Sequence, residues 1–491
     1  MSRPAVPRIL APMLAAALLG CTVGPDFHPP DVSPPTLWGP VAADVPSRTV
    51  AGDVDVAWWE RFNDPELTSL VQRLVVQNLD LKTAAERILQ GRAQRQVVAS
   101  QGLPQINGQS QYTRNRVSPT GTISLSEPAP GAPLEFDLFQ NALNSSWELD
   151  LFGKIRRSVE AQDATTLASV EDRRSLGLAA LAELASDYLQ LRGAQTQLGI
   201  AERNLQMAER NTQLVRDRFR QGVGTTLDLA QAQSQYATIA AAVPPLRTQP
   251  AALINAIGLL LGEQPRALEA ELLPRAPLPA VPPTVPVGLP GDLVRRRPDV
   301  REAEARLHAA TAQTGVAVAS FYPDLSLTGM ANMDGLRFAN AFSLPSRAFQ
   351  VGPSLSIPLF QGGQLTGTLH LRESEQREAA ITFQKTVLQA WQDVDNALTA
   401  YAEAQRQRAQ TVEAVRQNEV ALGAARQQYT LGATDFLNVV SSETQLLQSQ
   451  NNLASNDTAI ATDLVSLYKA LGGGWQALGD VVLPKQRLTD Q

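Results

Sequence analysis

The side chains that most often perform catalysis or bind metals are few in this sequence and lie far apart. The three histidines, His28, His308 and His370, have none of the short spacings that bring two metal ligands together on a helix or in a turn. No Gly-x-Ser-x-Gly elbow and no phosphate-binding loop occurs, and we interpret the Gly-x-Gly at 222–224 as a turn. We therefore expect no enzymatic activity, no metal site and no cofactor.

One residue has a setting that predicts covalent chemistry: Cys21, the only cysteine in the 491 residues. It follows a positively charged start and an apolar run over residues 9–19, as in a secretory signal peptide. The ending Leu-Leu-Gly-Cys resembles a bacterial lipobox, in which the thiol is acylated. We expect residues 1–20 to be a signal peptide and Cys21 to carry covalent lipid, a diacylglycerol and an N-acyl chain. The alternative is that Cys21 is a free, buried cysteine. By the same resemblance to bacterial lipoproteins, Thr22 in place of an aspartate implies sorting to the outer membrane.

The overall composition favours long, closely packed helices and argues against a nucleic-acid partner. The net charge of −6 provides no strong basic field. Aromatic residues make up 5% and charged residues 18% of the chain, and long stretches are mainly Ala, Gln, Leu, Ser and Thr. After residue 21, no stretch reaches the ~18 uncharged apolar residues that a membrane-spanning helix needs.

The predicted helices and strands follow one order of elements, and this order occurs twice along the chain. We expect an extended, lipidated, proline-rich segment over residues 21–64. The first repeat occupies 65–273 and the second 292–472. A proline-rich linker at 274–291 separates them, and residues 473–491 form a C-terminal tail.

Each repeat is expected to contain a helix, two strands, a very long helix and a last helix. Proline-free stretches predict the long helices, and alternation of apolar and polar residues predicts the strands. In the first repeat these elements are a helix at 65–101, strands at about 105–116 and 140–152, a long helix at 154–221, and a helix at 225–262 that Pro244, Pro245 and Pro250 disturb. In the second they are a helix at 298–320, strands at about 323–330 and 350–360, a long helix at 363–431 and a helix at 434–471.

The repeat is visible at the level of single residues. Phe219, Gly222, Leu227 and Asp228 correspond to Tyr429, Gly432, Leu437 and Asn438, each 210 residues later. Because this offset is a whole number of heptads, the two long helices keep the same coiled-coil phase. A seven-residue stripe passes through Leu184, Leu191, Leu198, Leu205, Thr212 and Phe219, and its second copy through Val394, Tyr401, Arg408, Val415, Leu422 and Tyr429. Thr212 and Arg408 are the irregular positions.

Four strands per chain cannot close a transmembrane barrel, because such barrels need at least about eight. Three chains supply twelve strands, and closed symmetric oligomers are the rule; two chains would also reach the minimum. The expected fold class is thus mixed α and β, mainly α. It combines a long coiled-coil α-helical barrel with four strands that each chain contributes to a transmembrane β-barrel, and the family resemblance described next implies that this barrel is trimeric and 12-stranded.

The order of several motifs resembles the TolC/OprM outer-membrane factor family, NodT-like lipid-anchored efflux channels, along almost the whole chain. The motifs are Gly20-Cys21-Thr22-Val23-Gly24-Pro25-Asp26-Phe27, Trp58-Trp59 with Asp64-Pro65-Glu66-Leu67, Trp147-Glu148-Leu149-Asp150-Leu151-Phe152-Gly153, Arg296-Arg297-Pro298-Asp299-Val300-Arg301, Phe321-Tyr322-Pro323 and Leu471-Gly472-Gly473-Gly474-Trp475. The resemblance implies a homotrimer in the outer membrane with a periplasmic tunnel. Its partners would be outer-membrane lipid, a periplasmic adaptor (membrane fusion protein) and an inner-membrane pump of the RND type.

The resemblance also implies a periplasmic gate near the helix turns at Gly222, Gly224 and Gly432. The family's latching aspartate and tyrosine fall on Asp228 and Tyr429, and a constricting leucine falls on Leu437. An arginine of TolC is replaced by Thr434, and two aspartates by Asn438 and Ser441. Asp435 or Glu443 are candidates to replace the missing carboxylates. Packing of Tyr429 and Leu437 and a helix-dipole role for Asp228 remain alternatives.

The sequence therefore predicts a passive outer-membrane conduit of a tripartite efflux system. Two alternatives remain: the outlet of a protein-secretion system, and a structural envelope lipoprotein without a pore. The cargo and the particular adaptor and pump are not predicted.

Overall fold

The computed structural model describes residues 22–36, 38–39, 44–118 and 134–479. The chain divides into two compact units. The strand unit contains Ile88–Ala168 and Glu304–Thr382 together with the described residues up to Pro30, and the helix unit contains Asp31–Arg87, Ser169–Ala303 and the chain from Phe383. Each unit takes segments from both sequence repeats, so the repeats interleave and do not fold as separate domains.

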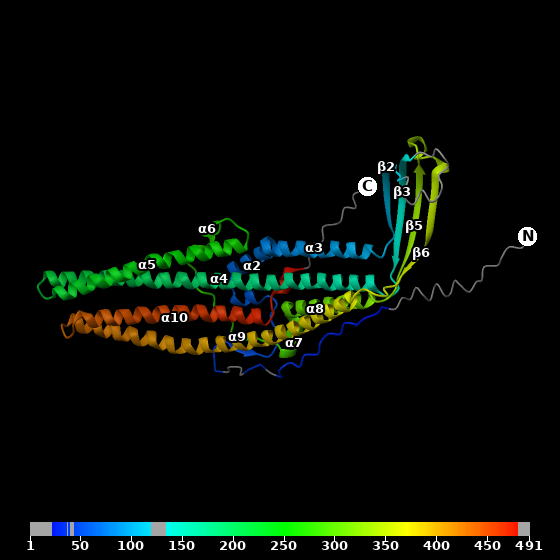
Figure 1. Cartoon of the computed structure of the whole chain (residues 1–491). Coiled ribbons are helices and arrows are strands. Elements are labelled where there is room, and N and C mark those ends of the chain that lie inside the picture. Colours follow the sequence, from blue (N-terminus) through cyan, green and yellow to red (C-terminus); the bar gives the residue numbers. More distant parts are fainter. Residues whose placement is uncertain (1–21, 37, 40–43, 119–133, 480–491) are drawn as a thin grey trace, which may run out of the picture. The chain divides into compact units, whose positions relative to one another are not determined.

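The strand unit contains an antiparallel sheet in the order β2-β3-β5-β6 (Figure 1). Its strands are β2 (Gln105–Arg116), β3 (Glu135–Leu149), β5 (Asp324–Gly335) and β6 (Arg347–Ser356). The prediction placed β3 at 140–152, β5 at 323–330 and β6 at 350–360, so it missed residues 135–139, 331–335 and 347–349 and placed the ends of β3 and β6 a few residues too late. Pairing explains the difference, because Glu135 lies opposite Arg116 and Gly335 opposite Phe139, where the local sequence does not alternate.

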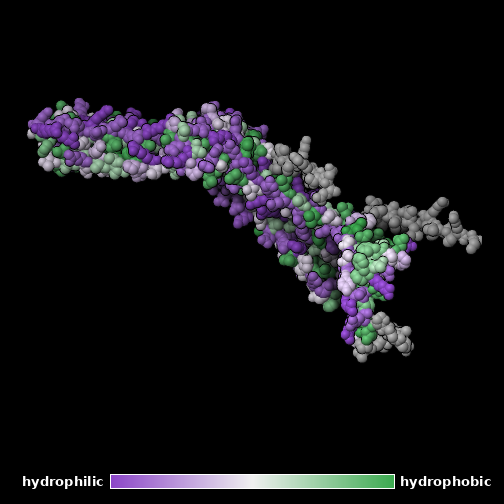
Figure 2. Space-filling model, turned by 90° about the horizontal axis from the view of Figure 1, so that it is seen from above, coloured by the Kyte–Doolittle hydropathy of each residue, from purple (hydrophilic) through white to green (hydrophobic). Residues whose placement is uncertain are grey.

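Over the paired residues 143–149, 325–329 and 350–355, the register gives the sheet a mostly apolar face and a polar face. Side chains directly opposite each other lie on the same face. One face carries Ile106, Leu143, Trp147, Leu149, Leu325, Leu327, Val351 and Leu355, and the other carries Asn107, Asn144, Ser146, Glu148, Ser326, Thr328, Gln350 and Ser354. The apolar face is uncovered in the single chain: Val351 is 68% and Leu143 58% exposed. Figure 2 shows hydrophobic residues (green and pale green) gathered over one part of the strands beside hydrophilic ones (purple).

The segment after Cys21 is held against the start of a helix in the strand unit. Arg157, only 4% exposed at its side chain, donates to the Asp26 carboxylate at 2.6 Å and to Glu160 at 2.8 Å. Phe27 stacks on His308 with ring centroids 4.3 Å apart. Residues 22–27 are therefore docked by charge and ring contacts. Cys21 and the signal peptide at 1–20 lie outside the described residues.

Two long helices and two shorter ones form a pair of hairpins (Figure 1). The long helices are α4 (Lys154–Arg220) and α9 (Gln364–Thr430), each of 67 residues, and their partners are α5 (Thr226–Leu260) and α10 (Phe436–Ala470), each of 35 residues. At ~1.5 Å per residue a long helix spans roughly 100 Å. Among the described helices, none is both long enough and apolar enough to cross a membrane.

The expected single helix at 65–101 was wrong, and so was the expected disturbance by prolines in the helix at 225–262. The helix expected at 65–101 is two helices, α2 (Pro65–Gln77) and α3 (Leu79–Ser100). The break is Asn78, whose side chain donates to the Leu260 carbonyl at 2.8 Å and accepts from the Leu81 amide at 2.9 Å. The helix α5, in contrast, is continuous through its three prolines.

The connecting segments contain short elements that the sequence did not predict. The expected linker at 274–291 contains β4 (Thr284–Pro286), which pairs in parallel with β1 (Arg48–Val50). The other short elements are η1 (Trp58–Phe62), α6 (Glu269–Leu272), α7 (Pro290–Arg296), η3 (Phe338–Asn340), η4 (Leu344–Ser346) and η5 (Trp475–Leu478). The longer helix α8 (Pro298–Ala319) agrees with the helix predicted at 298–320.

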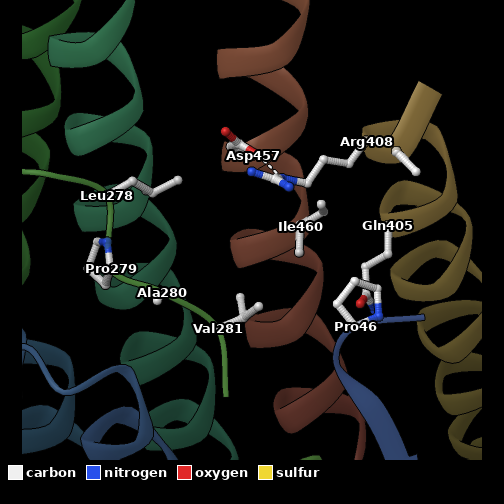
Figure 3. A pocket seen from close by; sticks show the side chains of 10 residues that line it. Pro46, Leu278, Pro279, Ala280, Val281, Gln405, Arg408, Asp457 and Ile460 are labelled. Atoms are coloured by element: carbon white, nitrogen blue, oxygen red, sulfur yellow. Dashed lines mark hydrogen bonds and ion pairs between the residues drawn. The ribbon is translucent and has the colours of Figure 1, made fainter. Parts of the chain in front are cut away.

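The heptad stripe forms the core of the helix unit over part of its length. Leu184, Leu191, Val394 and Tyr401 on it are fully or almost fully buried. The irregular Arg408 forms an ion pair with Asp457 at the edge of a hollow of about 380 Å³ (Figure 3). The irregular stripe position in this part of α9 is therefore satisfied by a charged partner on α10.

Motifs from distant parts of the sequence meet in one group of the helix unit, the Trp58 cluster (Trp58, Tyr468, Gly473, Arg297 and Ala470). Trp58 is fully buried, stacks on Tyr468 with ring centroids 5.2 Å apart, and donates to the Gly473 carbonyl at 3.0 Å. Arg297 donates to the Ala470 carbonyl at 3.1 Å. The tryptophan, arginine and glycine motifs of the chain thus fix one another in space.

Candidate functional site

The two hairpin turns have the same construction. At the first, Gly222 has φ +77° and its amide donates to the Phe219 carbonyl at 3.0 Å. At the second, Gly432 has φ +72° and its amide donates to the Tyr429 carbonyl at 3.0 Å. Glycine is required because a side chain disfavours a positive φ. A Cβ on Gly224 would lie 3.0 Å from the Phe219 backbone nitrogen, so the lack of a side chain at Gly224 lets the turn pack closely against the backbone at the end of α4.

The helices that leave the turns begin differently. Thr225 and Asp228 form a capping box at the start of α5: the Asp228 amide donates to Thr225 Oγ1 at 3.0 Å, and the Thr225 amide donates to Asp228 Oδ2 at 3.2 Å. At the start of α10 the side chain of Asp435 makes no capping hydrogen bond, and Asn438 Nδ2 donates to Thr434 Oγ1. The carboxylate of Asp228 is therefore engaged in its own helix start.

Tyr429 lies in the last turn of α9 and is only 6% exposed. Its ring contacts Phe436 edge-on at 5.1 Å between centroids. Its hydroxyl has no hydrogen-bond partner among the described residues. Burial, with the negative charge of Asp228, raises the pKa of Tyr429 against the opposing effect of Arg218. The expected bond between Asp228 and Tyr429 is thus not made within this chain, and a latch between them stays a prediction about the assembled protein.

The predicted constriction residues share one exposed face at the start of α10. Leu437, Asn438 and Ser441 are exposed, whereas Phe436 before them and Val439 among them are buried. Positions three and four residues apart lie on the same side of a helix, so Leu437 and Asn438 are both neighbours of Ser441. The structure therefore brings the three predicted residues together, and the exposed Asp435 precedes them.

Of the two carboxylates considered as substitutes, Glu443 points the other way. It is 7% exposed, and it accepts from Arg426 Nη2 at 2.7 Å and from Asn211 Nδ2. A carboxylate buried between helices cannot line an open constriction. Glu443 is therefore a contact between helices, and of the two substitutes only Asp435 remains exposed.

Sequence reasoning missed Arg218, which reaches from the end of α4 to the end of α9. Its Nη1 donates to the Thr430 carbonyl at 3.1 Å, and its guanidinium carbon lies 5.0 Å from the centroid of the Tyr429 ring. A basic residue in a last helical turn is a common local pattern, and it does not indicate which helix the side chain contacts.

A small apolar core lies between the two hairpins near their turns. It is separate from the main core of the helix unit. Its buried members are Val215, Ala232, Leu422, Ala425, Tyr429, Phe436, Val439 and Leu446. The irregular heptad position Thr212 is buried nearby and donates to the Ala232 carbonyl at 3.1 Å. The hairpin ends are thus packed together as well as joined by polar contacts.

Comparisons with known proteins agree on one kind of protein. The family model described as outer membrane efflux protein matches residues 70–263 and 289–473. The cation efflux system protein CusC of Escherichia coli O6:H1 (strain CFT073) is 28% identical, with 96% of this chain and 99% of CusC covered. The solvent efflux pump outer membrane protein SrpC of Pseudomonas putida is 30% identical, with 94% and 98% covered. The solved outer-membrane channel OprN has a TM-score of 0.84 at 33% identity, covering 93% of this chain and 100% of OprN.

Proposed function

Since this chain belongs to the outer membrane efflux protein family, we propose that it is the outer-membrane channel of a tripartite efflux system. Small toxic molecules would pass through it passively, delivered by a periplasmic adaptor and an inner-membrane pump. Relatives of this chain are named for the efflux of cations, solvents, toluene and antibiotics. This favours small molecules over polypeptides as cargo.

The two-faced sheet is the observation that carries the proposal. Its apolar face is exposed in the single chain, and its outer strands β2 and β6 each have one edge without a strand partner among the described residues. Unpaired edges and exposed apolar faces are costly in water, and in lipid every backbone group must be paired. Three copies joined edge to edge would pair all edges in a twelve-stranded barrel, with the apolar face toward lipid and the polar face toward the lumen.

The hairpin turns support docking of the adaptor. Val223, Leu227, Leu431 and Leu437 are all more than half exposed there, and apart from the adjoining residues no described side chain or backbone atom would contact a Cβ at Gly222 or Gly432. Apolar side chains with open space around them suit another protein's helix ends. In this proposal Cys21 carries the lipid anchor, and the docked residues 22–27 connect it to the strand unit.

A pair of substitutions on β6 tests the orientation of the sheet. Val351 lies on the apolar face and its neighbour Gln350 on the polar face. An arginine facing lipid costs about 2–4 kcal/mol near the middle of a bilayer. Val351→Arg should therefore reduce the amount of assembled protein in outer-membrane fractions, and Gln350→Arg should leave it near the wild-type amount. Equal tolerance of both changes would argue against a lipid-facing sheet.

Transport is tested by deleting the gene in its native host and measuring growth inhibition by solvents, antibiotics and metal cations. The proposal expects greater sensitivity to at least one class, restored by the wild-type gene but not by the Val351→Arg variant. Unchanged sensitivity to the whole panel, with the partner pump expressed, would contradict a role in efflux.

A further inference from the structure

The connection between β5 and β6, residues 336–346, is packed back onto the sheet. Phe139 and Asn141 of β3 lie on the same side of the sheet as the apolar face, because side chains alternate along the strand. Asn141 Nδ2 donates to the carbonyl of the buried Ala341 at 3.1 Å. Phe338 meets the Phe139 ring edge-on, with the ring centroids 5.7 Å apart. The connection therefore has a fixed place on the side of the sheet that continues into the apolar face.

This connection exposes four large apolar side chains, which we call the rim cluster: Leu336, Phe338, Phe342 and Leu344. Each of them is between 61% and 69% exposed. The rings of Phe338 and Phe342 are in contact, with their centroids 6.5 Å apart. A contiguous group of exposed apolar side chains indicates contact with another molecule or with lipid. Aromatic side chains are common where a barrel leaves the membrane, so the rim cluster alone does not distinguish one lipid from another.

Two arginines beside the rim cluster have no partner for their charge. Arg337 lies between the first two members of the rim cluster in the chain. Arg347 is the first residue of β6 and lies on the side of the apolar face, four residues before Val351. Both arginines are exposed, and neither guanidinium group has an ion pair or a hydrogen bond within the described residues. Two positive charges therefore remain uncompensated beside exposed apolar side chains.

The arginines of β2, at the same end of the sheet, are neutralised instead. Arg114 pairs with Glu135 at 3.1 Å and with Asp137 at 3.5 Å. Arg116 pairs with Glu135 at 3.3 Å. These residues face one another across β2 and β3, where opposite charges stabilise the pairing of the strands. This end of the sheet therefore has one part with balanced charge and one part with two unpaired arginines.

The rim cluster lies at the end of the sheet away from the helices that continue from it. Strand β5 follows α8 and leads to the connection, and β6 returns from it toward α9. In the proposed channel the helices are periplasmic, so the connection lies at the outer surface of the outer membrane. We propose that the rim cluster, Arg337 and Arg347 form a binding site for a phosphorylated glycolipid of the outer leaflet, of the lipid A class. This inference rests on the proposed channel function, which fixes the side of the membrane.

The two chemical parts of such a lipid match the two parts of the site. Its phosphate groups accept hydrogen bonds from guanidinium groups, which bind phosphate in bidentate geometry. Arg337 and Arg347 give up no ion pair with a described residue when they do so. The acyl chains of the lipid continue along the apolar face, where Phe349 is 82% and Val351 68% exposed. A glycolipid without phosphate keeps the apolar contacts and loses the charged ones.

Native mass spectrometry of the purified full-length protein in detergent tests the site with two probes. One probe is lipid A with its phosphates, and the other is the same lipid after enzymatic removal of the phosphates. The variants are Arg337→Gln, Arg347→Gln and the double variant, which replace exposed side chains without partners in the described chain and should fold normally. The matched control is Arg116→Gln, which removes the same charge from the same side of the sheet, but from an arginine that Glu135 already neutralises.

We expect the wild-type protein to prefer the phosphorylated probe. Each single arginine variant should bind this probe about fivefold more weakly, and the double variant about 25-fold more weakly, because the two contacts are independent. Arg116→Gln should bind it as the wild type does, and all the arginine variants should bind the dephosphorylated probe alike. Phe342→Ala should weaken the binding of both probes by the same factor, since it removes only an apolar contact.

Equal binding of the phosphorylated probe by the wild type and the double arginine variant would overturn the site. Equal binding of the two probes by the wild-type protein, a comparison that needs no variant, would overturn it as well. The same holds for equal binding of phosphatidylglycerol, which would show that any anionic lipid is sufficient.

The lipid measurement is independent of transport, so the site and the channel function can fail separately. Unchanged sensitivity of the gene-deletion strain would contradict the channel function, and the preference for the phosphorylated probe would still decide the site. Loss of that preference in the double arginine variant, in a strain whose efflux is intact, would support the site and leave the channel function standing.

Discussion

Replacement of Trp58 should destabilise the helix unit strongly, although this residue is far in sequence from most of its contacts. Trp58 is fully buried, its indole Nε1 donates to the Gly473 carbonyl, and its ring stacks on Tyr468. Trp58→Ala removes the ring and its contacts, which costs about 3–5 kcal/mol. Trp58→Phe keeps an aromatic ring but leaves the Gly473 carbonyl without its donor, which costs about 1–3 kcal/mol.

These free energies translate into shifts of the thermal midpoint. Unfolding entropy is about 2.1 cal/mol/K per residue, so a chain of 491 residues loses roughly 1 °C per kcal/mol. The expected decreases are about 3–5 °C for Trp58→Ala and about 1–3 °C for Trp58→Phe. They can be measured by circular dichroism at 222 nm on the detergent-solubilised protein, with one heating rate throughout because unfolding of such proteins is often irreversible.

Tyr468→Phe is the matched control, since it changes the other ring of the same stack. The Tyr468 hydroxyl is buried and has no hydrogen-bond partner in the part of the chain that the structure describes. Its removal takes away an unpaired polar group and should leave the midpoint unchanged or raise it. A decrease in Tyr468→Phe as large as in Trp58→Phe, or no decrease in Trp58→Ala, would refute the assignment of the stack and the Gly473 bond.

Three further predictions concern the turn, the N-terminal segment and pH. Gly432→Ala should destabilise the protein by about 1 kcal/mol because φ is positive at Gly432. Gly423→Ala, inside α9 with open space around it, should stabilise the protein slightly, so the two variants should shift the thermal midpoint in opposite directions. Arg157→Gln should make the N-terminal segment sensitive to limited proteolysis, with the more exposed neighbour Arg156→Gln resistant; equal resistance would contradict docking by Arg157. Burial, with a neighbouring carboxylate, raises the pKa of Asp187 to about 6. Because the folded state then holds a proton that the unfolded state releases near pH 4, stability falls as pH rises from about 4 to 6, and Asp187→Asn should raise the midpoint at pH 8 but not at pH 4.

Local patterns in the sequence were sufficient to predict the secondary-structure elements that depend on residues close to one another in the chain. The long helices, the hairpin turns and the four strands depend on contacts between residues close in the chain, such as Gly222 with Phe219, or on an alternation within one strand. The 210-residue repeat and the family motifs then indicated a channel protein, which the comparisons confirm at the level of an outer-membrane efflux family.

Only the tertiary structure decided which side each polar residue faces and which distant residue it contacts. The sequence made Glu443 a candidate for lining a constriction, and the structure buries it against Arg426 and Asn211. It gave no sign that Arg218 binds the carbonyl of a residue 212 positions away, or that Asn78 divides a helix by bonding to Leu260. Helical and strand patterns record neighbours within a few residues, whereas these contacts exist only after separate helices have packed together.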